Sequence, residues 1–225
     1  MFKTETHLHV SEVSPCGHLG AEEMVRRYAE AGYHTVFISD HFTGKFFGNL
    51  KDMPNEEKID AFLKGYELAR RAGAKYGLRV LMSAELQLNE SSHHYLLYNV
   101  DRDFLLSVID CLNMPIAEFY AYAKAHGVTV IHAHPYRDGA YEPWDTVTVD
   151  AVEAHNSNPR HDNLDDTVRA YAQKHALPVT AGSDAHRPED VAGTGVLTPF
   201  PIECAEDYVR AVIEGSAEII YGGAR

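Results

Sequence analysis

The sequence lacks the features that mark several classes of protein. Its 225 residues include only three cysteines, an odd number at wide spacing, so a disulfide scaffold is not expected. No apolar run approaches the roughly 18 residues of a membrane span. Lysine and arginine total 20 against 33 aspartates and glutamates, a net charge of −13. No basic surface is therefore expected to bind the backbone of a nucleic acid, and we predict a soluble protein with neither nucleic acid nor membrane as its partner.

The chain also shows no N-terminal segment in which basic residues precede an apolar run, the pattern of a secretion signal. Together with the few cysteines, this favours a reducing cytoplasm. Hydrophobic residues make up 45% and charged residues 24% of the sequence, which is close to the globular average. The length is enough to bury a core, and we expect residues 1–225 to form a single domain.

Turn residues and changes of apolar spacing divide the chain into alternating strands and helices. Strands are predicted at 2–10, 35–39, 79–88, 95–100, 128–132, 151–154, 178–183 and 218–221, and helices at 21–31, 55–76, 104–111, 115–125, 163–175 and 203–214. About seven such alternations indicate an α/β fold with a parallel sheet, and the repeat of roughly 30 residues is typical of a closed βα barrel. A doubly wound open sheet is the alternative, although no glycine-rich phosphate-binding fingerprint occurs.

Histidine is over-represented, with 14 residues, many of them close together in sequence. His7 and His9 lie two apart in a predicted strand, so both imidazoles face the same side and can bind one cation. A single pair of this kind is as often hydrogen-bonded or solvated. Here, however, the segments HLH, SDH, SAE, HAHP and GSDAH each follow or end an apolar strand. Since the carboxyl ends of parallel strands meet at one rim, we expect these groups to converge there.

These segments resemble the polymerase and histidinol phosphatase (PHP) superfamily of metal-dependent phosphoesterases. The resemblance covers most of the chain in order, from ETHLHVSEVSPCGHLGAEEMV through TVFISDHF, VLMSAELQL, VIHAHPYR and AVEAHNSN to VTAGSDAHRPEDVAGTG. It implies a distorted (β/α)7 barrel with two or three divalent ions at its carboxyl rim. The mixture of imidazole and carboxylate groups independently favours Zn²⁺, Mn²⁺ or Fe²⁺ over Mg²⁺ or Ca²⁺.

The resemblance also implies the ligands of these ions. One ion would be held by His7, His9, Glu85 and Asp184; Glu85 would bridge to a second ion bound by His134; His41 and His186 would hold a third. The remaining ligand of the third ion falls where this chain has Cys16, in place of the family's frequent aspartate or histidine, with His18 as the alternative. The remaining ligand of the second ion is either His94 or Asp101. His132 and His155 are expected to form hydrogen bonds rather than bind metal.

Two ions roughly 3.5–4 Å apart can hold a hydroxide and neutralise phosphoryl oxygens, which predicts hydrolysis of a small phosphorylated metabolite by a metal-bound hydroxide. Asp184 or His186 would carry the proton, while Glu85 bridges the ions. Three arginines follow the motifs by a few residues and are candidates to bind the phosphate, each with an ordinary surface position as the alternative: Arg137, Arg160 and Arg187.

Two other functions use similar residues. The first is an amidohydrolase-type enzyme acting on a C–N or C–O bond, which often has a carboxylated lysine, but no lysine ends a predicted core strand. The second is a non-catalytic PHP module that only binds metal, against which the near-complete ligand set argues. Around the rim, Phe42, Phe46 and Phe47 could wall a substrate pocket or pack beneath it, and Trp144 could be a lid or a buried anchor.

Overall fold

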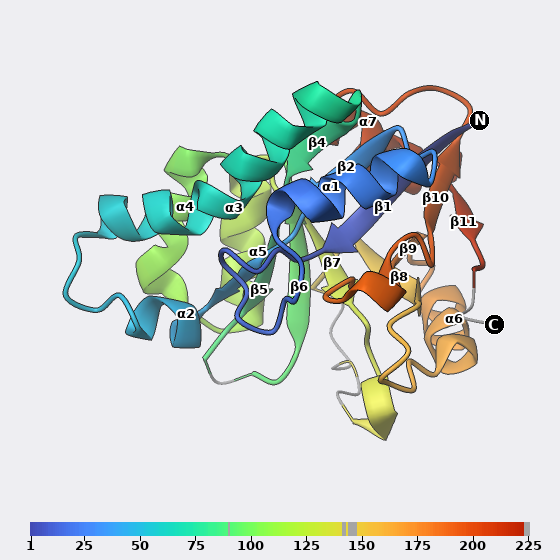
Figure 1. The fold of residues 1–225 in the computed structure, drawn as a ribbon. Helices are drawn as coiled ribbons and strands as arrows, with labels where there is room; N and C mark the ends of the chain where they lie inside the picture. Colours follow the sequence, from blue (N-terminus) through green and yellow to red (C-terminus); the bar gives the residue numbers. More distant parts are fainter. Residues whose placement is uncertain (90, 141–142, 144–147, 223–225) are drawn as a thin grey trace.

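The computed structural model describes residues 1–89, 91–140, 143 and 148–222, and its strands form two sheets (Figure 1). The first sheet has the order β11-β10-β1-β2-β4 and the second the order β3-β5-β6-β7-β8-β9. The strands are β1 Phe2–Leu8, β2 Thr35–Ile38, β3 His41–Thr43, β4 Arg79–Met82, β5 Ala84–Gln87, β6 His94–Tyr98, β7 Thr129–Ala133, β8 Ala151–Asn156, β9 Val179–Gly182, β10 Gly195–Thr198 and β11 Glu218–Ile220. The predicted α/β class is confirmed.

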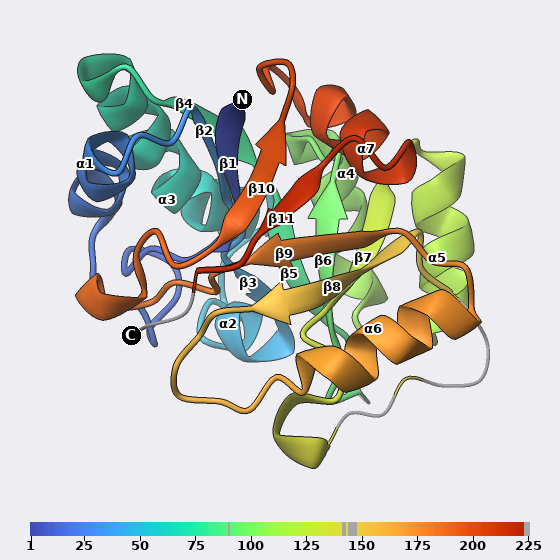
Figure 2. The same cartoon turned by 90° about the vertical axis from the view of Figure 1, so that its right-hand side faces the viewer.

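Helices cover both sheets. They are α1 Ala21–Glu30, α2 Gly44–Gly48, α3 Asn55–Tyr76, α4 Arg102–Val108, α5 Ile116–Ala125, α6 Asp165–Lys174 and α7 Ala205–Ile213, with 3₁₀ turns at Ile109–Cys111, Arg137–Gly139 and Pro188–Asp190. Helices α1 and α3 lie side by side (Figure 1), and α6 lies along β8 (Figure 2). Helix α3 ends at Gly77, whose φ of 70° favours glycine, as the sequence predicts.

The two sheets share segments of chain. Strands β2 and β3 are separated only by Ser39 and Asp40, and β4 and β5 only by Ser83. The predicted strand 79–88 is therefore wrong in one respect, because it breaks at Ser83 and passes from the first sheet to the second. Leu8, the last residue of β1, forms an isolated parallel bridge with Ala185, which lies three residues after the end of β9. Across the described residues, ladder pairing gives these two sheets, and closure into a (β/α)7 barrel is not confirmed.

The prediction of a parallel sheet is also wrong in part. Strand β6 runs antiparallel to both β5 and β7, and β10 runs antiparallel to β1 and β11. The reason lies in the connection: residues 88–93 join β5 to β6, and a parallel crossover needs a dozen or more residues. This reversal brings the first residue of β6 to the same edge as the last residues of β5 and β7.

The core explains most of the aromatic residues near this edge. Phe42 and Phe47 are buried and pack edge-to-face at a centroid distance of 4.7 Å, whereas Phe46 is half-buried. Phe42 and Phe47 thus pack in the core beneath the rim, which was one of the alternatives for this aromatic segment. Trp144 lies outside the described residues. No helix within the described part of the chain is long and apolar enough to cross a membrane.

Candidate metal centre

Ligand-type side chains from both sheets meet at one edge. His7 and Leu8 are the last two residues of β1. His41 is the first residue of β3 and pairs with Glu85 of β5, and His94 is the first residue of β6. The segment after β9 lies next to the loop after β1 (Figure 1), where the amide of His18 donates to the carbonyl oxygen of His186 at 2.7 Å. The expected convergence of distant motifs at one edge is therefore present, although one contributing strand is antiparallel.

Glu85 lies at the centre of this cluster and is almost fully buried. Its Oε1 lies 2.8 Å from Nδ1 of His94, 2.9 Å from Nε2 of His134 and 3.5 Å from Nε2 of His7. Its Oε2 lies 2.6 Å from Nδ1 of His41 and 3.4 Å from Nε2 of His9. One carboxylate thus contacts five imidazoles, the arrangement required of a bridging ligand.

Asp184 completes a second group with His7 of β1 and with His9, which directly follows that strand. The Nε2 atoms of His7 and His9 lie 3.1 Å apart, and Oδ1 of Asp184 lies 3.6 Å from the first and 3.2 Å from the second. Four donor atoms, these three and a Glu85 oxygen, therefore surround one small volume. This is the predicted set for the first ion, brought together from three separate parts of the sequence.

The donor set fits divalent transition metals. Within the described residues, four triads have ligand atoms all within 4.8 Å of one another: His9–His41–His186, His7–His9–Glu85, His7–His134–Asp184 and His41–Glu85–His94. Oε2 of Glu85 and Nδ1 of His41 are buried and make no hydrogen bond, although they lie 2.6 Å apart. Buried polar atoms are normally satisfied, and a cation bound by this pair would satisfy both atoms. The mixture of nitrogen and oxygen donors suits Zn²⁺, Mn²⁺ or Fe²⁺.

Burial and mutual charge set the pKa values in the cluster. Burial lowers the pKa of His7, but the carboxylates of Glu153, Asp184 and Glu85 outweigh it and raise this pKa well above its usual value. Burial would raise the pKa of Glu85, yet the charges of the surrounding histidines hold it well below. Burial and the neighbouring imidazoles of His186 and His41 lower the pKa of His9. Burial would likewise raise the pKa of Asp184, but Arg137 and His7 hold it well below its usual value. Glu85 and Asp184 are thus stabilised as anions, the form that binds metal.

Two of the cluster residues adopt a backbone conformation that is uncommon for residues other than glycine. His134 has a φ of 31° and Asp184 a φ of 51°. The amide of His134 donates to Oε2 of Glu153 at 2.9 Å, and Asn158 donates from Nδ2 to the carbonyl oxygen of Asp184 at 3.2 Å. Such strained residues persist where the surroundings fix them, most often at functional sites.

The structure distinguishes between the residues that were alternatives as metal ligands. His94 lies against Glu85, whereas Asp101 caps α4 by accepting from the amide of Phe104 at 2.8 Å. Nε2 of His132 pairs with Nδ1 of His93 at 3.1 Å, so this histidine forms a hydrogen bond beside the cluster. His155 is hydrogen-bonded through Nδ1 to Asp165.

Cys16 lies at the exposed side of the cluster. Its Sγ is 3.2 Å from Nε2 of His41. Burial would raise the pKa of this thiol, but hydrogen bonds with His186 and His41 lower it to about 6. His18, the alternative to Cys16, has an exposed side chain and belongs to none of the donor triads of the described residues.

A cavity of about 230 Å³ opens on the cluster and contains all three predicted arginines in its lining. Arg137 is buried, with Nη2 2.7 Å from Oδ2 of Asp184 and Nε 2.9 Å from Asn163. Arg160 grips both oxygens of Asp190, at 2.7 and 2.8 Å. Arg187 is half-buried, and within the described chain its guanidinium has no ion pair or hydrogen bond.

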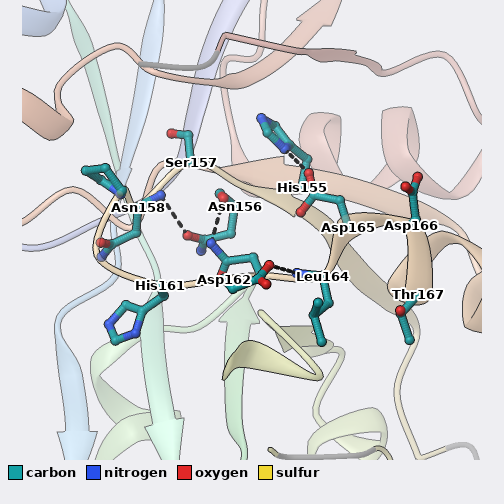
Figure 3. A pocket seen from close by; sticks show the side chains of 12 residues that line it. His155, Asn156, Ser157, Asn158, His161, Asp162, Leu164, Asp165, Asp166 and Thr167 are labelled. Atoms are coloured by element: carbon teal, nitrogen blue, oxygen red, sulfur yellow. Dashed lines mark hydrogen bonds and ion pairs between the residues drawn. The ribbon is translucent and has the colours of Figure 1, made fainter. Parts of the chain in front are cut away.

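Two further hollows adjoin this cavity. One, also about 230 Å³, shares Cys16, His41 and His94 with it and is otherwise lined by Val13, Pro15, Thr43, Lys45, Phe46, Asn49 and Gln87. The other, about 520 Å³, shares Asn158 and His161 and lies within the loop that joins β8 to α6 (Figure 3). Of the three phenylalanines that could wall a substrate pocket, Phe46 alone lines the first of these hollows.

Comparison with known proteins finds one matching family model and several solved structures of similar fold. A family model described as PHP-associated matches residues 165–217. A two-domain protein of Bacteroides vulgatus that contains a predicted PHP-like metal-dependent phosphoesterase has a similar fold, with a TM-score of 0.65 and 14% identity over 98% of this chain. This chain spans only 65% of that protein's length.

Two other solved structures share the fold. PsfC of Pseudomonas syringae PB-5123 has a TM-score of 0.69 and 15% identity, over 98% of this chain and 91% of its own. An amidohydrolase of Chromobacterium violaceum, solved with sulfate and without metal, has a TM-score of 0.57 and 14% identity over 97% and 98% of the two chains. No curated protein matches the sequence.

Proposed function

We propose that this chain is a member of the PHP superfamily and a metal-dependent hydrolase of small phosphomonoesters. The observation that carries the proposal is Glu85, whose two carboxylate oxygens lie within 3.5 Å of five histidine nitrogens at the edge of a cavity. A single buried carboxylate with this many imidazoles suits a bridging position between two cations.

The protein side chains divide into two ligand sets. His7, His9, Glu85 and Asp184 would hold one ion, and Glu85, His94 and His134 a second. Bound divalent ions would lower the pKa of water toward neutrality and neutralise charge on phosphoryl oxygens. Of the two predicted proton carriers we assign this role to Asp184, which lines the cavity and whose Oδ2 is held by Arg137 at 2.7 Å.

The arginines have different roles in this proposal. Arg137 fixes Asp184, and Arg160 fixes Asp190, which in turn accepts hydrogen bonds from the amides of His186 and Arg187 at 2.9 Å each. Both are positioning residues. Arg187 alone of the three has an unengaged guanidinium among the described residues, so we assign to it the grip on phosphate oxygens.

The apolar hollow beside the ligands would receive the alcohol part of the substrate. Phe46 forms one wall, and its ring is fixed by edge-to-face contacts with Phe47 at 5.1 Å and Phe62 at 5.9 Å. Its volume of about 230 Å³ equals about eight water molecules at roughly 30 Å³ each. This favours an alcohol about the size of a single ring, with Gln87 at the lining as a hydrogen-bonding group.

Amidohydrolase chemistry is the second candidate, favoured by the likeness to the Chromobacterium violaceum protein. It often relies on a carboxylated lysine, and no described residue lining the arginine-containing cavity is a lysine. The phosphomonoester proposal is therefore preferred.

The test is a panel of phosphorylated metabolites, amides and lactones, each assayed with Mn²⁺, Zn²⁺ and Fe²⁺ after chelator treatment. The proposal expects metal-dependent release of inorganic phosphate. Turnover of amides or lactones alone would favour the second candidate, and metal binding without any turnover would favour a non-catalytic module.

A further inference from the structure

The apolar hollow that contains Phe46 extends from the metal cluster along two paired strands. His41 of β3 pairs with Glu85 of β5 at the cluster, and two residues further on Thr43 pairs with Gln87. Side chains two residues apart in a strand lie on the same face, about 7 Å apart. Thr43 and Gln87 both line the hollow. A group bound beside them would therefore lie about 7 Å from the bridging carboxylate.

Three polar side chains of this hollow are not engaged by the protein. Lys45, Asn49 and Gln87 line it, and within the described part of the chain none of these side chains has an ion pair or a hydrogen bond. Gln87 is half-buried, whereas Lys45 and Asn49 are exposed at its opening. Three groups that can donate hydrogen bonds thus surround one cavity that offers them no acceptor.

The charge of the hollow is opposite in sign to that of the whole protein. The chain has a net charge of −13, yet no aspartate or glutamate occurs among the described residues of this lining. Its two histidines, His41 and His94, face Glu85 through Nδ1 at 2.6 and 2.8 Å. The ammonium of Lys45 therefore faces the hollow without a counter-ion, and a cleft of one sign with apolar walls attracts the opposite charge.

The helix that carries Lys45 has a fixed position. The hydroxyl oxygen of Thr43 accepts from the amide of Phe46 at 3.2 Å and so caps α2. A Cβ at Gly44 would collide with Oδ1 of Asn89, because α2 begins in close contact with the segment that follows β5. Lys45 and Phe46 are neighbours on this helix, so the fold places a cation next to the apolar wall.

We propose that the alcohol part of the substrate carries a carboxylate, which Lys45 binds with hydrogen bonds from Gln87 and Asn49. The substrates are then phosphomonoesters of hydroxy acids about the size of a single ring. One ammonium and two amides match the single charge of a carboxylate, whereas a second phosphate group would call for more charged donors. This inference rests on the proposed function, which places the phosphoryl group at the metal ions.

The first test compares phenyl phosphate with meta- and para-carboxyphenyl phosphate, which differ from it only in the added anion. Wild-type protein should have a KM about five- to tenfold lower for at least one carboxylated substrate, the effect of an ion pair that is partly exposed. Lys45→Gln should remove this difference by raising the KM of the carboxylated substrate. Lys51→Gln is the matched control, because this exposed lysine lies outside the hollow and its loss changes the net charge equally.

Charge reversal separates recognition from a general disturbance of the site. Lys45→Glu should disfavour the carboxylated substrates and favour meta- or para-aminomethylphenyl phosphate, whose cation then meets a carboxylate. A merely structural role of Lys45 would raise the KM of all these substrates in parallel, and that result would overturn the inference.

Binding of inert analogues gives a readout that needs no turnover. Calorimetric titration of wild-type protein should show tighter binding of a carboxybenzylphosphonate than of benzylphosphonate, with a preference that decreases as salt is added. Equal binding and equal KM within each pair, or a preference that persists in Lys45→Gln, would overturn the inference. If metal-dependent hydrolysis of phenyl phosphate is then still observed, the proposed function stands. If the wild type hydrolyses no phosphomonoester and binds neither phosphonate, both fail.

Discussion

Oε1 of Glu153 lies 3.0 Å from Nδ1 of His7 and so aims the other nitrogen of that imidazole at the metal cluster. Oε2 of the same carboxylate accepts from the amide of His134 and from Nδ2 of Asn156, both at 2.9 Å. Glu153 itself contributes to none of the donor triads of the described residues. One buried carboxylate thus orients two ligands without binding the ion, a common arrangement behind metal-bound histidines.

The first prediction follows from this contact. Glu153→Gln should lower metal affinity by about 10- to 100-fold. The amide has a single acceptor oxygen, so it cannot accept from His7 on one side and from His134 and Asn156 on the other. Calorimetric titration with Zn²⁺ measures the change. Glu118→Gln on the exposed face of α5 is the matched control and should bind as wild type does. Equal affinity in the two variants would show that Glu153 plays no such part.

The second prediction concerns the bridge. Glu85→Gln should weaken two ions at once, by at least about 100-fold each, because the neutral amide supplies charge to neither. The fold should remain intact, since the two side chains have the same shape. Elemental analysis after dialysis reports the bound ions per chain. Full metal content together with an unchanged rate would mean that Glu85 is not a bridging ligand.

Asp190 provides a prediction about stability and pH. Burial raises the pKa of this carboxyl, but hydrogen bonds from Arg160 and from the His186 amide hold it below its usual value. Because the folded-state pKa is the lower one, the stabilisation is complete above the unfolded pKa of about 4 and declines as the pH falls through the folded value. Asp190→Asn should lower the free energy of unfolding by about 1–3 kcal/mol at pH 7.

The same variant should lose less of its remaining stability on acidification than wild type does, because it has no carboxylate to protonate at this position. Urea unfolding of the metal-free proteins at pH 7 and at pH 4 measures both effects. Identical pH dependence in the two proteins would contradict the assigned role of the Arg160–Asp190 pair.

Arg187 gives a prediction that separates substrate binding from metal binding. Arg187→Ala should raise KM for a phosphomonoester by about 10- to 100-fold, the cost of losing charge-assisted hydrogen bonds, while the ion content stays unchanged. Arg71→Ala on the exposed face of α3 is the control. A KM unchanged from wild type would move the phosphate grip to Arg137 or Arg160.

Phe46 tests the placement of the alcohol group. Phe46→Ala should raise KM for phenyl phosphate by about tenfold, through lost apolar contact, and leave KM for glycerol phosphate nearly unchanged. Phe2→Ala, at the start of β1 and equally half-buried, should alter neither value. A parallel change for both substrates in Phe46→Ala would indicate a general disturbance of the site instead.

Much of this site could be predicted from local patterns. The two-residue period of a strand places His7 and His9 on one face, and helix α3 has the predicted bounds of 55–76 because its apolar stripe and Gly77 mark them. Such signals lie within a few residues of one another. They therefore do not depend on how distant segments pair.

The direction of a strand could not be inferred in the same way. The antiparallel course of β6 decides that His94, and not Asp101, reaches Glu85. The short 88–93 connection contained the relevant signal, because it is too short for a parallel crossover. The break at Ser83 and the pairing of Arg160 with Asp190 depend on contacts between segments far apart in sequence, which no local pattern records.

The most direct test of the central claim is a titration of chelator-treated protein with Mn²⁺ or Zn²⁺, in which bound ions per chain and release of inorganic phosphate are followed together. The account predicts no turnover in the stripped protein and full turnover only as occupancy reaches about two ions per chain or more. Turnover without metal, or saturation below one ion per chain, would contradict it.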